Sequence, residues 1–265
     1  MILFALSANA SIAALFVAGI VPGLLMCAGF MGVCWWVGRR RGFPRDTTPF
    51  AWPAFRRHLL YASPALLLPV LIIVFLRFGI ATPTEVAVLS TLYAGLVSAA
   101  IYRDLGWRRL NDAVVHAGLA TGVVLLVIMA SSAIGWLLTF DRMPDGIVQW
   151  VQSHVHSAWL VIVLMNLLML FIGMFIDLPA AVLLLTPVFV PLAQSIGMDM
   201  TQLGIMMVVN LALGLYTPPV GTTLFITSSL ARVKVGQTVR ELIPFYLVAL
   251  AVLALVSYVP ASILR

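Results

Sequence analysis

The sequence predicts an all-α membrane protein, a polytopic bundle of about six transmembrane helices with one re-entrant helical hairpin and one broken helix. Hydrophobic residues make up 63% of the chain and charged residues only 9%, whereas a soluble domain carries roughly 25% charged residues. Apolar runs long enough to cross a bilayer alternate with short polar gaps. Two further runs are interrupted by Gly and Pro rather than by a polar loop.

Four crossings are predicted in the first half of the chain. They cover residues 11–37, 59–76, 86–102 and 113–140. Residues 1–10 precede them as an apolar tail. Residues 45–58 combine Trp and Phe with Arg, a composition that suits the cytoplasmic headgroup layer. Before the third crossing, Thr82 and Glu85 have the spacing of a capping box, which predicts a structural rather than a catalytic role for both.

Residues 157–198, which follow a polar loop at 141–156, form the predicted re-entrant hairpin. Two apolar runs are separated there only by Asp177, flanked by Gly173 and Pro179. Non-helical backbone at membrane depth is tolerated where protein or a water-filled cavity surrounds it, so a helix that dips in and returns fits better than two crossings. Asp177 is costly inside a bilayer, and we expect it to shape the hairpin tip as a helix cap or to contribute to an ion site.

Residues 202–231 form the predicted broken helix. They carry no charge, but Pro218 and Pro219, followed by Gly221, should unwind the helix because Pro removes a backbone donor and clashes with the preceding turn. Broken helices place backbone carbonyls and half-helix ends at membrane depth, where they coordinate ions such as Na⁺. A last crossing covers residues 242–264.

The two breaks together are the candidate ion site. Na⁺ prefers oxygen ligands, which the carbonyls of both breaks, the Thr217 hydroxyl and the amides of Asn166 and Asn210 would supply. The predicted ion-binding residues are Gly173, Asp177, Asn210, Gly214, Thr217 and Gly221, and the predicted helix-break or hairpin-tip residues are Pro179, Pro218 and Pro219. The alternative is that the prolines only kink a packed helix.

Nothing in the sequence indicates an enzyme, a cofactor, a metal other than Na⁺ or nucleic acid as a partner. The chain has no Gly-rich phosphate loop and no nucleophile elbow. His154 and His156 lack a nearby third metal ligand. The Arg residues lie in gaps between apolar runs, which indicates membrane topology rather than a phosphate-binding face. We expect Cys27 and Cys34, which are not a CxxC pair, to be small buried residues.

The distribution of positive charge predicts the orientation. If the gap after the first crossing is cytoplasmic and residues 157–198 return to the side they left, twelve of the 15 Lys and Arg residues lie in the cytoplasm. These are Arg39, Arg40, Arg41, Arg45, Arg56, Arg57, Arg103, Arg108, Arg109, Arg232, Lys234 and Arg240. A single full crossing at 157–198 would place the last three outside, against the positive-inside rule.

Four blocks occur in order along the chain: residues 11–23, 79–85, 173–177 with 185–187, and 206–221. Together they resemble the large membrane subunit of tripartite ATP-independent periplasmic (TRAP) transporters. The resemblance implies a multi-pass protein of the bacterial inner membrane that takes part in Na⁺-driven symport. It also implies two partners, a small TRAP membrane subunit and a periplasmic binding protein that delivers an organic acid such as a C4-dicarboxylate or sialic acid.

The resemblance further implies two inverted repeats, each with a hairpin and a broken helix, that move by an elevator motion against a scaffold. On this resemblance we expect the chain to correspond to the C-terminal portion of such a subunit, with the first repeat missing. On this basis the expected parts are residues 1–10, the tail of a preceding broken helix; 11–110, scaffold-like helices with the interfacial segment at 45–58; 111–235, the second repeat; and 236–265, a C-terminal transmembrane helix.

Three other functions stay open at this point. A binding-protein-independent dicarboxylate/Na⁺ symporter would share the fold, and a non-transporting membrane scaffold fragment would only pack against partners. An intramembrane enzyme has the least support, because no paired acids or metal triad accompany the breaks.

The orientation is testable with reporter fusions in the complete protein. Fusions after Arg41, Arg109 or Lys234 should report the cytoplasm, and a fusion within residues 141–156 should report the periplasm. A periplasmic signal at Lys234 would contradict the re-entrant hairpin.

Overall fold

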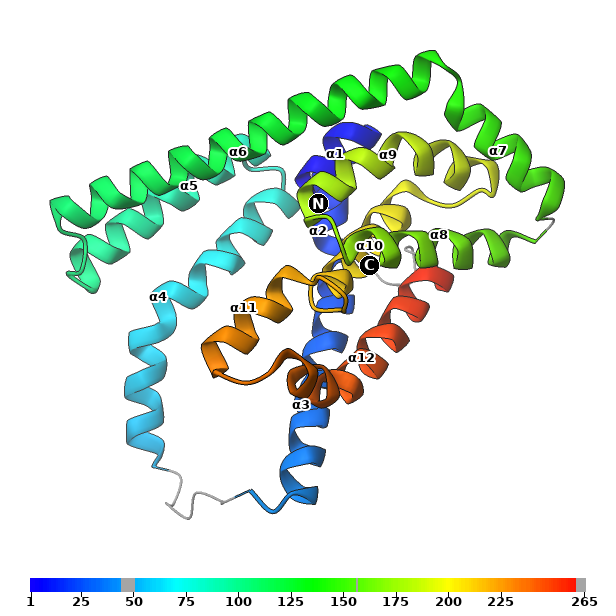
Figure 1. The fold of residues 1–265 in the computed structure, drawn as a ribbon. Helices are drawn as coiled ribbons and strands as arrows, with labels where there is room; N and C mark the ends of the chain where they lie inside the picture. The colour runs from blue at the N-terminus through cyan, green and yellow to red at the C-terminus, as the bar shows by residue number, and fades with distance from the viewer. Residues whose placement is uncertain (44–50, 156, 261–265) are drawn as a thin grey trace. The chain divides into compact units, whose positions relative to one another are not determined.

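The computed structural model describes residues 1–43, 51–155 and 157–260, without the side chain of residue 152. Over these residues the chain is helical and has no β-strand, so the predicted all-α class is confirmed (Figure 1). The chain divides into two compact units, Met1–Val37 with Val124–Arg265, and Gly38–Val123. These boundaries differ from those of the predicted scaffold and transport parts, whose roles stay predictions.

The unit Gly38–Val123 is built around two neighbouring helices, α4 (Trp52–Arg77) and α5 (Pro83–Leu96), with a π-helix, η1 (Val97–Ile101), continuing α5. Two tyrosine hydroxyls join them: Tyr93 donates to the Pro64 carbonyl at 2.8 Å and Tyr102 to the Tyr61 carbonyl at 2.9 Å. The first part of α6 (Trp107–Phe140) completes the unit.

The predicted capping box begins α5. Thr82 accepts from the Glu85 backbone N–H, while the Glu85 carboxylate accepts from the Thr82 backbone N–H at 2.7 Å. The box confirms the predicted structural role of Thr82 and Glu85, because it satisfies two donors that the first turn of a helix leaves without partners.

The predicted interfacial segment at 45–58 is not a separate element where the structure describes it. Residues 45–50 lie outside the described residues, and the rest continues directly into α4, with the rings of Trp52 and Phe55 stacked 5.6 Å apart. A helix of 26 residues is about 39 Å long. It exceeds the roughly 30 Å hydrocarbon core, so its first turns can lie in the headgroup layer without a break.

The other unit holds the remaining helices. They are α1 (Ile2–Ala8), α2 (Ile12–Ala18), most of α3 (Ile20–Arg40), the end of α6, α7 (Met143–His154), α8 (Ala158–Gly173), α9 (Leu178–Ser195), α10 (Met200–Gly214), α11 (Thr222–Ala231) and α12 (Val235–Tyr258). Helix α10 is the centre of this unit, since 11 of its 15 residues are buried and it packs against α1, α2, α8, α9 and α12. At Gly204 an added Cβ would lie 2.6 Å from both Phe4 and Leu15, so α1 and α2 lie directly on α10.

The loop predicted at 141–156 contains a helix, which corrects the sequence interpretation. Helix α7 has Pro144 in its first turn, a favourable position for Pro because no intrahelical bond is lost there. Its apolar face, with Val151 buried and Ile147 and Val148 half-buried, packs against α9. Asp145 and His154, two of the polar residues that suggested a loop, are exposed on this amphipathic helix.

Cys27 and Cys34 are exposed and not bonded to each other, so the prediction that they are buried was wrong. Both lie on α3, whose contact with α12 is made elsewhere, including the rings of Phe30 and Phe245, 5.6 Å apart. Small apolar residues on a helix that faces lipid or another subunit need no burial within the chain.

Six helical segments in the described part of the chain are long and apolar enough to cross a membrane. They are Ile12–Arg40, Trp52–Arg77, Pro83–Ile101, Trp107–Phe140, Leu178–Ser195 and Val235–Tyr258. The first four and the last match predicted crossings, so the polytopic architecture is confirmed. The predicted broken helix falls short of this length because the break leaves α10 with 15 residues and α11 with 10.

Replacing Thr82 with Ala removes the side-chain half of the capping box and should cost about 1 kcal/mol of stability. The measurement is thermal unfolding of the purified protein in detergent. Thr121→Ala in α6 is the matched control, since that hydroxyl only donates to its own helix at the Ala117 carbonyl. If Thr121→Ala lowered the stability of the protein as much as Thr82→Ala does, the capping role would be contradicted.

Candidate functional site

The hairpin tip has the predicted shape. Helix α8 ends at Gly173, residues 174–177 turn, and α9 begins with Asp177 as its N-cap residue and Pro179 in its first turn. The Asp177 carbonyl accepts the first helical bond, from the Ala181 N–H at 2.9 Å, but its exposed side chain accepts no capping hydrogen bond. Asp177 therefore shapes the tip through its backbone, and the predicted contribution of its carboxylate to an ion site stays a prediction.

The broken helix unwinds where Pro218 and Pro219 predicted. Helix α10 ends at Gly214 and α11 begins at Thr222, and the Thr223 N–H donates to the Leu215 carbonyl at 3.0 Å across the turn between them. Gly221 has a φ of 46°, and an added Cβ would lie 2.8 Å from the Thr217 carbonyl oxygen and 3.1 Å from that of Leu215. Only Gly fits both the left-handed conformation and this close approach.

The two breaks are in direct contact. A Cβ added to Gly214 would lie 2.4 Å from the carbonyl carbon of Gly173 and 2.6 Å from its oxygen, so the ends of α8 and α10 meet backbone to backbone. The Gly221 N–H donates to the Met174 carbonyl at 3.1 Å, which joins the start of α11 to the hairpin tip. Residues 173, 214 and 221 are thus brought together, while their role in ion binding stays a prediction.

The oxygen atoms predicted as ligands lie on the last turns of α10 and just beyond it. The Thr217 hydroxyl donates to the Leu213 carbonyl at 2.7 Å, which leaves its lone pairs available to a cation. One turn before Gly214, Asn210 is fully buried and its amide nitrogen donates to the backbone and side-chain oxygens of Asn166, at 2.9 and 2.8 Å. The Asn210 side-chain oxygen is buried and has no hydrogen-bond partner among the described residues.

Sequence reasoning missed a pair of tyrosines at the break. The Tyr246 hydroxyl of α12 donates to the Tyr216 carbonyl, and the two rings stack 5.7 Å apart and nearly parallel. The bond satisfies a backbone carbonyl of the break, just beyond the end of α10. The available signal was the residue type, since the phenol of a Tyr inside an apolar helix usually finds a partner.

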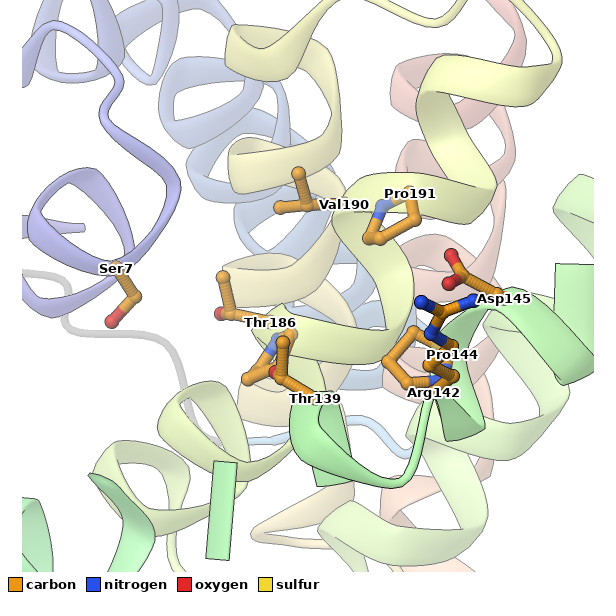
Figure 2. Close-up of a pocket in the computed structure, with 9 residues that line it drawn as sticks. Ser7, Thr139, Arg142, Pro144, Asp145, Thr186, Val190 and Pro191 are labelled. Carbon is orange, nitrogen blue, oxygen red and sulfur yellow. The ribbon is translucent and has the colours of Figure 1, made fainter. Parts of the chain in front are cut away.

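A second candidate site is a cavity of about 240 Å³ lined by α1, the α6–α7 junction and α9 (Figure 2). Figure 2 shows Ser7 on one side and Arg142 with Asp145 on the other. Arg142 and Asp145 are exposed, and the buried hydroxyl of Thr186 donates to its own helix at the Val182 carbonyl, 2.6 Å away. The cavity therefore offers weaker grounds for a ligand than the two breaks.

No three His, Cys, Asp or Glu side chains gather into a possible metal site within the described part of the chain. An ion held at the breaks would accordingly rely on carbonyl, hydroxyl and amide oxygens. Such a ligand set favours a hard monovalent cation over a transition metal.

The chain was then compared with known proteins. The family model of the DctM component of tripartite ATP-independent periplasmic transporters matches residues 1–262. The chain belongs to the DctM family. The resemblance found from the four sequence blocks is confirmed, and a DctM-family chain is a transporter component rather than an enzyme.

Three relatives show what this DctM-family chain is similar to. Over 98% of its length the chain is 55% identical to "Uncharacterized protein y4mL" of Sinorhizobium fredii, and the matched region covers 62% of that protein. It is 34% identical to the C4-dicarboxylate TRAP transporter large permease protein DctM of Pseudomonas aeruginosa and 33% identical to the sialic acid TRAP transporter large permease protein SiaM of Vibrio cholerae. In both cases 98% of the chain covers 61% of the relative. The chain thus spans about three-fifths of the length of these relatives.

Gly214→Ala should destabilise the DctM-family chain by about 1–3 kcal/mol, because the new methyl group overlaps the Gly173 backbone, which cannot rotate away. Thermal unfolding in detergent would measure the loss.

Gly23→Ala is the matched control for this substitution. Gly23 lies in α3 with no other heavy atom within 4 Å of an added Cβ, and Ala favours a helix interior over Gly by about 1 kcal/mol. The control should therefore be neutral or stabilising. Equal effects of the two substitutions would show that α8 and α10 do not approach as closely as described.

Proposed function

We propose that this chain carries one Na⁺ site of a TRAP-type secondary transporter that imports small organic acids. The observation that carries the proposal is the direct contact of the two helix breaks at Gly173 and Gly214. Membership of the DctM family supports transport as the general function, and the printed names of relatives that act on C4-dicarboxylate and sialic acid support organic acids as the substrate class.

The helix ends at the contact favour a cation. Helices α8 and α10 both end there, with 16 and 15 residues, so two C-terminal ends meet within backbone contact. Each end carries a partial negative charge equivalent to roughly half an elementary charge. Two such ends repel each other unless positive charge lies between or beside them, and a bound Na⁺ would supply it.

The ligands proposed for this ion are the carbonyl oxygens of the breaks, the Thr217 hydroxyl and the Asn210 amide oxygen. Gly173, Gly214 and Gly221 admit the close backbone approach, while Pro179, Pro218 and Pro219 hold the breaks open. A bound ion would hold the hairpin tip and the broken helix together. Helices α9 and α11 begin on the far side of each break, and their N-terminal ends favour the carboxylate of the transported acid.

The proposed setting is the bacterial inner membrane. The partners proposed are a small TRAP membrane subunit and a periplasmic substrate-binding protein, since a DctM-family chain is one component of a tripartite system. The six apolar helical segments supply the multi-pass anchoring.

Thr217→Val tests the proposal, because it keeps the shape of the side chain and removes the hydroxyl. In the complete transporter the apparent Na⁺ affinity should fall by about tenfold to a hundredfold, the equivalent of about 1–3 kcal/mol for one lost ligand at a buried site. The measurement is Na⁺-dependent substrate uptake into proteoliposomes.

Thr227→Val is the matched control, since Thr227 makes the same kind of bond within its helix, to the Thr223 carbonyl at 2.8 Å, but lies in α11 away from the break. It should leave the Na⁺ dependence unchanged. If Thr217→Val also left it unchanged, with normal uptake, Thr217 would not be a ligand and the break would be packing geometry only.

A further inference from the structure

Three helices of the unit that contains the breaks are joined by one chain of polar side chains, formed by Ser257 of α12, Asn166 of α8 and Asn210 of α10. Ser257 and Asn210 are buried, with 1% and 0% of their surface exposed. Polar side chains so placed in an apolar bundle are costly unless they are bonded to each other, so the direction of each hydrogen bond matters.

The Ser257 end sets that direction. Its hydroxyl has a single hydrogen, which it donates to the Leu253 carbonyl at 2.7 Å, so towards Asn166 the Ser257 oxygen can only accept. It accepts from the Asn166 amide nitrogen at 3.0 Å, and the same nitrogen donates to the Ile162 carbonyl at 3.0 Å. Both hydrogens of the Asn166 amide group are thereby engaged, and its side-chain oxygen is turned towards Asn210.

The orientation of the Asn210 side-chain amide follows from that of Asn166. Its nitrogen meets two acceptors, the side-chain and backbone oxygens of Asn166, at 2.8 and 2.9 Å. Rotating the Asn210 amide by half a turn would place its oxygen against both acceptors. The hydrogen bonds therefore determine which side-chain atom of Asn210 is the nitrogen and which is the oxygen. The Asn210 side-chain oxygen is therefore the one that stays without a partner among the described residues.

We propose that Ser257 is a positioning residue of the ion site: acting through Asn166, it holds the Asn210 amide so that its oxygen is presented to the bound cation. This inference rests on the proposed Na⁺ site. Asn210 lies one helical turn before Gly214, where the ends of α8 and α10 meet, and a buried oxygen without a donor suits a cation.

The end of α12 is anchored in the same place. Gln202, in the first turn of α10, donates from its side-chain nitrogen to the carbonyls of Ser257 at 2.9 Å and Val256 at 3.3 Å. These carbonyls belong to the last turn of α12 and have no helical donor of their own. Ser257 is thus held against α10 by its backbone and against α8 by its side chain, which a positioning residue requires.

The test measures Na⁺ binding without any transported substrate. The purified protein is heated in detergent at increasing NaCl, with choline chloride keeping the ionic strength constant. A ligand that binds only the folded state raises the unfolding temperature with its concentration, and this dependence gives an apparent Na⁺ dissociation constant. Ser257→Ala should raise that constant about threefold to tenfold, the effect of losing one net hydrogen bond.

Two variants separate positioning from a general loss of stability. Ser228→Ala is the matched control, because Ser228 is also buried and hydrogen-bonded, to Thr238 at 2.9 Å, but stands outside the chain of side chains. It should lower the unfolding temperature without changing the Na⁺ dissociation constant. Ser257→Thr keeps the hydroxyl and should restore most of the affinity that Ser257→Ala loses.

Asn210→Ala distinguishes a failure of this inference from a failure of the ion site. If Asn210→Ala weakens Na⁺ binding and Ser257→Ala does not, Asn210 is a ligand and the positioning role of Ser257 is overturned. If the unmodified protein gains no more stability from NaCl than from choline chloride, the proposed Na⁺ site itself is overturned.

Discussion

The backbone contact between the ends of α8 and α10 is the constraint on which the rest of the candidate site depends. The two helices pack side by side and come closest near their ends, where a Cβ at position 214 would lie 2.4 Å from the carbonyl carbon of Gly173, so Gly214 is required for this approach. The contact sets where the hairpin tip and the broken helix lie relative to each other. It also gathers backbone carbonyl groups from the ends of both helices, and apolar surroundings do not tolerate such groups without a partner.

The neighbouring residues can be understood as ways of satisfying those carbonyls. Gly221 donates its N–H to Met174, Thr217 donates its hydroxyl to Leu213, and Tyr246 donates its hydroxyl to Tyr216. The bond from Thr217 is local, but the bonds from Gly221 to Met174 and from Tyr246 to Tyr216 join segments far apart in the sequence, so the site is largely a tertiary structure. Two buried side-chain atoms in the described part have no hydrogen-bond partner: the side-chain oxygen of Asn210 and the hydroxyl oxygen of Tyr216.

The rest of the molecule presents an apolar exterior that fits its place in a membrane. Helix α6 has no buried residue along 34 residues, and large side chains such as Trp107 and Trp136 are mostly exposed. In water such a surface would drive aggregation, whereas lipid or another subunit covers it at no cost. The core that packs like a soluble protein is confined to α10 and the helices around it.

The fold class, the apolar segments, the capping box at Thr82 and both breaks could be predicted from the sequence. Each follows from residues close together in the chain, such as a run of apolar side chains, a Thr and a Glu three residues apart, or adjacent prolines before a glycine. Sequence reasoning failed at α7, because its polar residues suggested a loop, whereas the segment is a helix whose apolar face packs against α9. Tertiary structure alone decided that Gly173 meets Gly214, that Tyr246 reaches the break, and that Ser257 orients Asn166, 91 residues away in sequence. Such pairings depend on how helices pack, and no local pattern of residues records which distant atoms a buried donor will find.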